Sequence, residues 1–119
     1  MRYVNGFFCL VMIGFTVVQY NDPDAIVWIL IYGITALWAG MAAFGLDRFA
    51  RSQVLITAFG ASLVAIAALT VYDWPPSIAD WWENELVREG LGLIISTCVL
   101  LVAAYTLWQA RREPPTVAG

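Results

Sequence analysis

The chain has 119 residues, of which 61% are hydrophobic and 13% are charged, and its formal net charge is −3. An average soluble domain carries about 25% charged residues, so this composition argues against an ordinary soluble fold. The sequence contains no histidine and no lysine, since all six basic residues are arginines. These absences argue against histidine-ligated haem or metal centres and against Schiff-base chemistry on lysine.

Four stretches of the sequence carry no charge, residues 3–21, 25–46, 52–72 and 90–110, with lengths of 19, 22, 21 and 21 residues. As helices rising about 1.5 Å per residue, each would span roughly 30 Å, the thickness of the hydrocarbon core of a bilayer. The sequence therefore predicts an all-α integral membrane protein, a four-helix bundle of up-down-up-down topology. We expect one transmembrane domain over residues 1–110, with helices at about 3–20, 23–44, 54–72 and 85–109, and a short polar cytoplasmic tail at 111–119.

The first two predicted helices are joined by a compact acidic turn, Gln19-Tyr20-Asn21-Asp22-Pro23-Asp24. Asn21 or Asp22 can cap the second helix, because a short side-chain oxygen satisfies one of its unpaired amides. Asp24 then falls in the first turn, where the helix dipole favours a negative charge. Trp28 and Tyr32 follow Asp24 by four and eight residues, so all three are expected on one helix face.

The segment 45–53 carries Asp47, Arg48 and Arg51, and is predicted to be a solvated turn within reach of anionic lipid. The helix that follows it has the largest share of small residues on one face. Small residues let membrane helices approach closely, so we expect the helix at 54–72 to be central in the packing. Its small residues are Ala58, Ala61, Ser62, Ala65 and Ala68.

The fourth predicted helix begins with a stripe of residues that share one face, Glu85, Arg88, Glu89 and Gly92. In a four-helix bundle this stripe and the acidic turn reach the same end. A guanidinium group matches a carboxylate bidentately. We therefore expect Arg88 to pair with Asp22, Asp24 or Glu85.

Arginine positions predict the orientation in the membrane. With four spans, five of the six arginines fall on one side and Arg88 falls on the other. The excess of positive charge on cytoplasmic loops then places both termini in the cytoplasm. We expect a multi-pass protein of the plasma membrane or the bacterial inner membrane. The five arginines are Arg2, Arg48, Arg51, Arg111 and Arg112.

Two motifs in the sequence resemble the signatures of the transmembrane protein 220 family. They are Val18-Gln19-Tyr20-Asn21-Asp22-Pro23-Asp24 with Trp28 and Tyr32, and Glu85-x-x-Arg88-Glu89-x-x-Gly92-Leu93. The resemblance implies a small four-helix membrane protein, and it brings no activity with it. The candidate binding residues lie in these motifs: Gln19, Asn21, Asp22, Asp24, Trp28, Tyr32, Glu85, Arg88 and Glu89.

Three functional interpretations fit the sequence. In the first and favoured one, the protein is a structural, assembly or accessory subunit that binds lipid, another membrane protein or a second copy of itself. In the second, an outward-facing acidic site binds a divalent cation or a cationic ligand, with or without transport. Carboxylates suit calcium and magnesium, and the metal candidates are Asp22, Asp24 and Glu89.

In the third interpretation, paired carboxylates serve an integral-membrane enzyme in acid–base catalysis. The missing histidine and lysine leave few nucleophiles or bases, so no enzymatic activity is expected. The predicted spans hold hydroxyl groups and no ionisable group near their centres, which argues against an ion path. We expect no catalytic residue, no cofactor apart from calcium or magnesium in the second interpretation, and no nucleic-acid partner.

Overall fold

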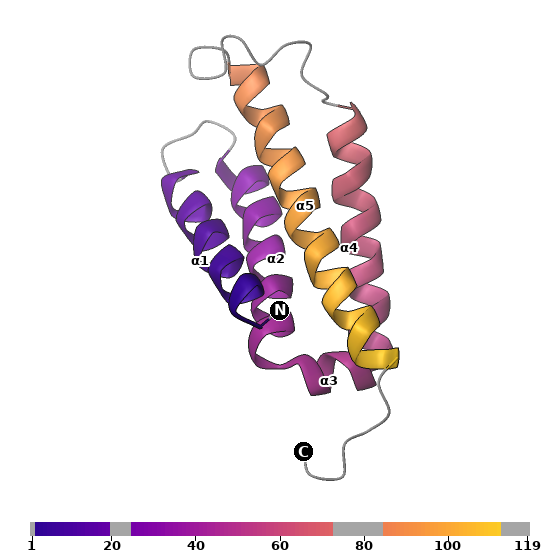
Figure 1. The fold of residues 1–119 in the computed structure, drawn as a ribbon. Helices are drawn as coiled ribbons and strands as arrows, with labels where there is room; N and C mark the ends of the chain where they lie inside the picture. The colour runs from indigo at the N-terminus through magenta and orange to yellow at the C-terminus, as the bar shows by residue number, and fades with distance from the viewer. Residues whose placement is uncertain (1, 20–24, 73–84, 113–119) are drawn as a thin grey trace.

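The computed structural model describes residues 2–19, 25–72 and 85–112, with residues 85–88 described by their backbone. Within these ranges the chain is helical and contains no strand. The helices are α1 (Arg2–Val18), α2 (Ala25–Phe44), α3 (Leu46–Arg51), α4 (Gln53–Tyr72) and α5 (Glu85–Arg112) (Figure 1). The all-α prediction is confirmed for this part of the chain, and α3 is the one of these helices that was not expected.

The four long helices lie side by side, with α2 and α5 between α1 and α4 (Figure 1). α2 packs along α1 on one side and along α5 on the other, and α5 also packs on α4. α3 lies across one end of the molecule, where α2 ends and α4 begins (Figure 1). Because α1 and α4 stand at opposite edges, each leaves one face uncovered by the described residues.

Small residues of α2 allow α1 to approach it closely. Ala39 is fully buried and Ala43 is nearly so. A β-carbon on Gly40 would lie 3.3 Å from the Sγ atom of Cys9, which is tighter than ordinary packing. Helices in lipid associate through van der Waals contact of this kind, since apolar side chains gain little by leaving apolar tails.

The segment that the sequence predicted as a solvated turn forms α3 and is anchored by a buried phenylalanine. The Phe49 side chain is fully buried. Its ring stacks on Trp38 with 5.4 Å between centroids and meets Phe59 edge-on at 5.3 Å. Trp38 and Phe59 also meet edge-on, at 5.6 Å. The prediction was wrong for Phe49 because its apolar surface draws the segment onto the bundle, while Arg48 and Arg51 remain exposed.

The predicted central position of the helix at 54–72 is also wrong. Of the candidate span in α4, 17% is buried, against 50% of the span in α5. α4 turns Phe59, Ile66 and Thr70 inward. Its sequence is apolar on every side, so the pattern of small residues did not reveal which face is covered. Four of the small residues are exposed: Ala58, Ala61, Ala65 and Ala68.

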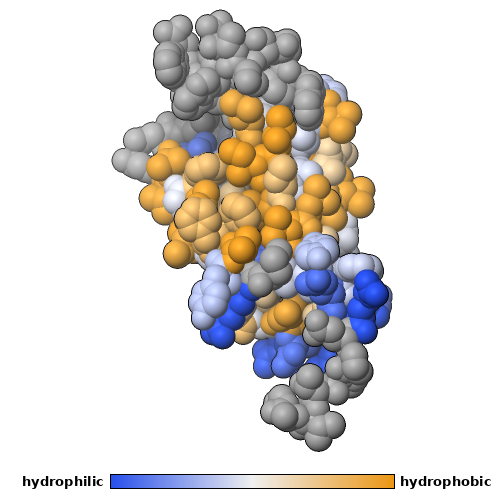
Figure 2. Space-filling view, viewed as in Figure 1, coloured by the Kyte–Doolittle hydropathy of each residue, from blue (hydrophilic) through white to orange (hydrophobic). Residues whose placement is uncertain are grey.

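Three of these helices are long and apolar enough to cross a membrane: α2, α4, and residues Glu89–Arg112 of α5. α1 is apolar as well but is shorter, with 17 residues. Figure 2 shows a broad hydrophobic band over the long helices and hydrophilic side chains at the α3 end. That division between an apolar body and a polar end is typical of a protein that sits in a bilayer.

The α3 end gathers five arginines from three helices. Arg2 begins α1, Arg48 and Arg51 lie on α3, and Arg111 and Arg112 end α5. The beginning of α1 is joined to the last part of α5 by a buried hydrogen bond, in which Asn5 Nδ2 donates to Thr106 Oγ1 at 2.8 Å. The predicted grouping of these arginines at one end is therefore present in the fold.

Candidate functional site

The two sequence motifs meet where Tyr32 of α2 contacts Gly92 of α5. Trp28 and Tyr32 are 6% and 5% exposed, and lie on one face of α2 as the spacing predicted. The Tyr32 ring lies 5.7 Å from the Trp28 ring and 5.5 Å from the Phe15 ring of α1, in the second case edge-on. Tyr32 therefore touches α1 and α5 at once and packs at the centre of the bundle.

Gly92 is required by this contact because it leaves room for the tyrosine. A β-carbon at position 92 would overlap the Tyr32 hydroxyl and would lie 3.0 Å from Tyr32 Cζ. Real β-carbons essentially never come closer than this to another heavy atom. The glycine in the second motif thus has a physical explanation, since it accepts the tyrosine of the first motif.

Glu89 lies one helical turn before Gly92 on α5, and its side chain is half-buried. Residues three apart on a helix share one face, so Glu89 is near the side of α5 that receives Tyr32. Gln19 is half-buried in a short turn of 3₁₀ geometry that follows α1. Gln19 therefore lies just after the end of α1, and Glu89 lies near the beginning of α5. Tyr32 contacts both of these helices.

The remaining predicted site residues have no described side chains. Asn21, Asp22 and Asp24 lie outside the described residues, and Glu85 and Arg88 are described by their helical backbone. Within the described ranges, no group of three or more carboxylate, thiol or imidazole side chains lies close enough to hold a metal ion. The pairing of Arg88 and the cation site at Asp22, Asp24 and Glu89 stay predictions.

A polar contact between α4 and α5 was not foreseen from the sequence. The Thr70 hydroxyl lies 2.8 Å from the Ile66 carbonyl oxygen and 3.1 Å from the Leu93 carbonyl oxygen. It also lies 2.8 Å from the Thr97 hydroxyl. Membrane-helix hydroxyls are expected to bond back to their own backbone, as Thr70 does. Its additional partners lie on α5, and the sequence did not indicate that α5 packs beside α4.

A second polar link joins α2 to α4. Trp38 Nε1 donates to Ser62 Oγ at 3.0 Å, and Ser62 in turn donates to the Ala58 carbonyl oxygen at 2.9 Å. Together with the ring contacts of Trp38, this bond fixes the inner face of α4. A tryptophan in an apolar span needs a partner for its N–H, which is the signal that could have directed attention to Trp38.

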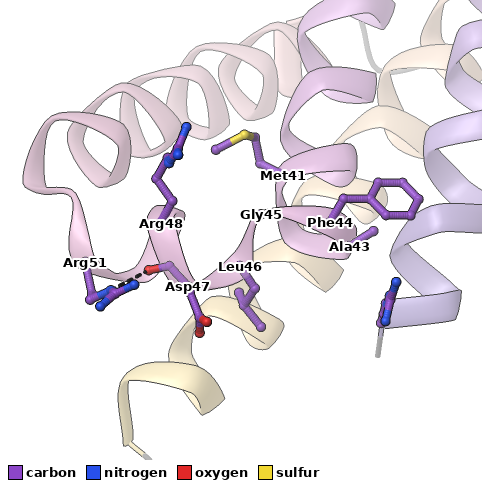
Figure 3. A pocket seen from close by; sticks show the side chains of 9 residues that line it. Met41, Ala43, Phe44, Gly45, Leu46, Asp47, Arg48 and Arg51 are labelled. Atoms are coloured by element: carbon purple, nitrogen blue, oxygen red, sulfur yellow. Dashed lines mark hydrogen bonds between the residues drawn. The ribbon is translucent and has the colours of Figure 1, made fainter. Parts of the chain in front are cut away.

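The α3 end holds a separate cavity of about 720 Å³, lined by three arginines (Figure 3). Arg2 comes from α1, and Arg48 and Arg51 come from α3. Figure 3 shows Arg51 bonded to α3 itself, where its Nε donates to the Asp47 carbonyl oxygen at 3.2 Å. This cavity lies at the end of the molecule where α3 crosses, away from the end at which α1 stops and α2 begins.

Comparison with known proteins identifies the family. No curated protein and no solved structure matches the chain. The sequence pattern of the family described as "Transmembrane family 220, helix" matches residues 11–105. The match includes both motifs that Tyr32 and Gly92 bring together and covers most of the chain. The chain therefore belongs to Transmembrane family 220, and it is a membrane protein.

Proposed function

We propose that the protein is a structural or accessory subunit of a membrane assembly, without catalytic activity. In this proposal the chain crosses a plasma or bacterial inner membrane four times. α1 is the fourth span, since it is apolar and packs along α2 over a comparable length. The five arginines at the α3 end support an orientation with both termini in the cytoplasm.

The observation that carries this proposal is the exposed alanine face of α4. α4 is the least buried of the three candidate spans. Its outer face presents Ala58, Ala61, Ala65 and Ala68, at spacings of three and four residues, so they follow one side of the helix. Small side chains at such spacings let a second helix approach closely, whereas a face that meets lipid alone has no need of them. The partner is proposed to be a transmembrane helix.

Site-specific photo-crosslinking in native membranes tests this surface. A photoreactive amino acid at Ala65 should give a discrete protein adduct, because a packed helix lies within reach of the probe. The same probe at Leu10, which is 70% exposed on α1, serves as the control and should react with lipid. An adduct with the mass of two chains identifies the partner as a second copy. Lipid adducts at both positions would contradict an assembly through α4.

Enlarging the alanine face should separate assembly from folding. With the probe kept at Ala65, Ala61→Leu with Ala68→Leu should abolish the adduct, since both side chains are exposed and the bulk blocks a neighbouring helix. The thermal stability of the isolated chain should change little for the same reason. A variant that still forms the adduct would show that the partner packs elsewhere.

Cysteine labelling tests the proposed orientation. A cysteine at position 77, between α4 and α5, should react with a membrane-impermeant reagent in intact cells. A cysteine in place of the exposed Gln53, at the α3 end, should react after the cells are opened. The reverse pattern would place the termini outside.

A cation-binding role is the second proposal, and the contact of Tyr32 with Gly92 favours it. That contact joins the helix following the acidic turn to the helix that carries Glu89. Carboxylates from two separate segments can then approach one another at the same end. Asp22, Asp24 and Glu89 would be the ligands of calcium or magnesium.

A further inference from the structure

The cavity at the α3 end is lined by both cationic and apolar side chains. Its lining includes Arg2, Arg48 and Arg51 together with the apolar side chains of Met41 and Phe44. Figure 3 shows Arg48 and Met41 extending toward the same opening. A site that offers guanidinium groups beside apolar surface suits a ligand with both a phosphate and a hydrocarbon part.

The positive charge of this cavity is not neutralised within the described part of the chain. Asp47 is the one carboxylate among the lining residues, against three arginines. No carboxylate of the described residues lies within 4.0 Å of a guanidinium nitrogen of Arg2, Arg48 or Arg51. By contrast, Arg112 at the same end stacks over the Trp108 ring, 4.5 Å from its centroid. Within the described residues the three lining arginines thus have no carboxylate partner, and Arg51 donates its Nε hydrogen to the Asp47 carbonyl oxygen.

An apolar groove of about 490 Å³ lies between α1 and α2. Met41 lines both the groove and the cationic cavity, so the two spaces adjoin at this residue. The groove extends from Met41 to Gly33 along α2, which is about 12 Å of helix at 1.5 Å per residue. Apart from Gly33's chain neighbours and its own helix backbone, no atom of the described residues lies within 4 Å of the place where a β-carbon on Gly33 would stand, so the groove is open there.

We propose that the cavity and the groove together bind one anionic phospholipid. The phosphodiester group lies against Arg2, Arg48 and Arg51, and one acyl chain follows the groove between α1 and α2. Basic pockets beside membrane spans bind anionic headgroups, and arginine is well suited to phosphate oxygens. The groove distinguishes this ligand from free phosphate, which has no apolar part to bury.

Native mass spectrometry of the full-length protein in a neutral detergent tests whether the arginines bind the lipid headgroup. Phosphatidylglycerol should bind with a stoichiometry of one, and phosphatidylcholine should bind more weakly. Removing two charges with Arg2→Gln/Arg48→Gln should weaken the binding of phosphatidylglycerol about 25-fold, because each arginine near the surface contributes roughly fivefold to the affinity. The matched control Arg111→Gln/Arg112→Gln removes the same charge at the same end, and should change the affinity less than threefold.

Equal weakening by the two double variants would overturn the proposal, because it would indicate diffuse attraction in place of a site. Equal affinity of wild-type protein for the two lipids would overturn it as well.

A variant with a filled groove tests whether an acyl chain lies between α1 and α2. Gly33→Leu places a side chain in the open groove and should weaken the binding of phosphatidylglycerol about tenfold. Gly14→Leu is the control, since Gly14 also has open space beside it and does not line the groove. Leu37→Trp, at an exposed residue that lines the same groove, gives a second blockage if Gly33→Leu does not fold.

Soluble glycerol 3-phosphate at millimolar concentration should leave the bound lipid in place. Displacement by glycerol 3-phosphate, or full affinity in a folded groove variant, would show that no acyl chain occupies the groove and would overturn the proposal.

Discussion

Replacing Gly92 by alanine tests whether the Tyr32–Gly92 contact holds α2 and α5 together. The new methyl group would overlap the Tyr32 hydroxyl and lie 3.0 Å from Cζ. Tyr32 cannot turn aside freely, because its ring packs against Trp28 and Phe15. The helices must therefore separate, or the ring must leave its packed position.

The expected cost follows from two opposing effects. Overpacking a well-packed site costs about 1–3 kcal/mol. Alanine is favoured over glycine in a helix by about 1 kcal/mol. This gain offsets part of the overpacking cost in the measured stability of Gly92→Ala. Gly60→Ala measures the helix preference alone, since no atom lies near the β-carbon it would add. The difference between the two variants should be about 1–3 kcal/mol, or about 5–150-fold in the unfolding equilibrium constant.

Unfolding in mixed micelles by titration with a denaturing detergent, followed by circular dichroism, measures this difference. Tyr32→Phe removes the hydroxyl that overlaps the methyl group, so Gly92→Ala should cost less in a Tyr32→Phe background. A double-mutant cycle gives the coupling between the two positions. If Gly92→Ala and Gly60→Ala have equal effects on stability, the close contact of Tyr32 with Gly92 does not exist and the reasoning fails.

Three further predictions concern the α3 anchor and the acidic turn. Phe49→Ala should destabilise the protein by about 3–5 kcal/mol in the same unfolding assay, because a fully buried ring is lost, whereas Phe7→Ala, at a side chain 63% exposed, should cost much less. Arg88→Leu and Asp24→Asn should show a coupling above about 0.5 kcal/mol in a double-mutant cycle, and additive effects would mean that the two residues do not interact. Millimolar calcium should raise the melting temperature of wild-type protein and not that of Asp22→Asn/Asp24→Asn, while an equal response of both would remove the cation site.

The sequence determined the four long helical segments and the charged end of the molecule. Long uncharged stretches have few alternatives to the helix in a bilayer, because every backbone polar group must be paired within the segment. The positions of Arg2, Arg48 and Arg51 likewise followed from the number of helices between them. The spacing of Trp28 and Tyr32 placed both on one face of α2, and the structure confirms it. These are local properties, and the sequence carries them fully.

The tertiary structure decided which faces of these helices are covered. α4 is apolar all round, so its edge position and its exposed alanines follow from how it packs on α5. The burial of Phe49 depends on the rings of Trp38 and Phe59, which arrive from two other helices. The reason for Gly92 appears when Tyr32 occupies the space beside it. Contacts between distant segments depend on the relative placement of whole helices, and a pattern along one helix does not contain that information.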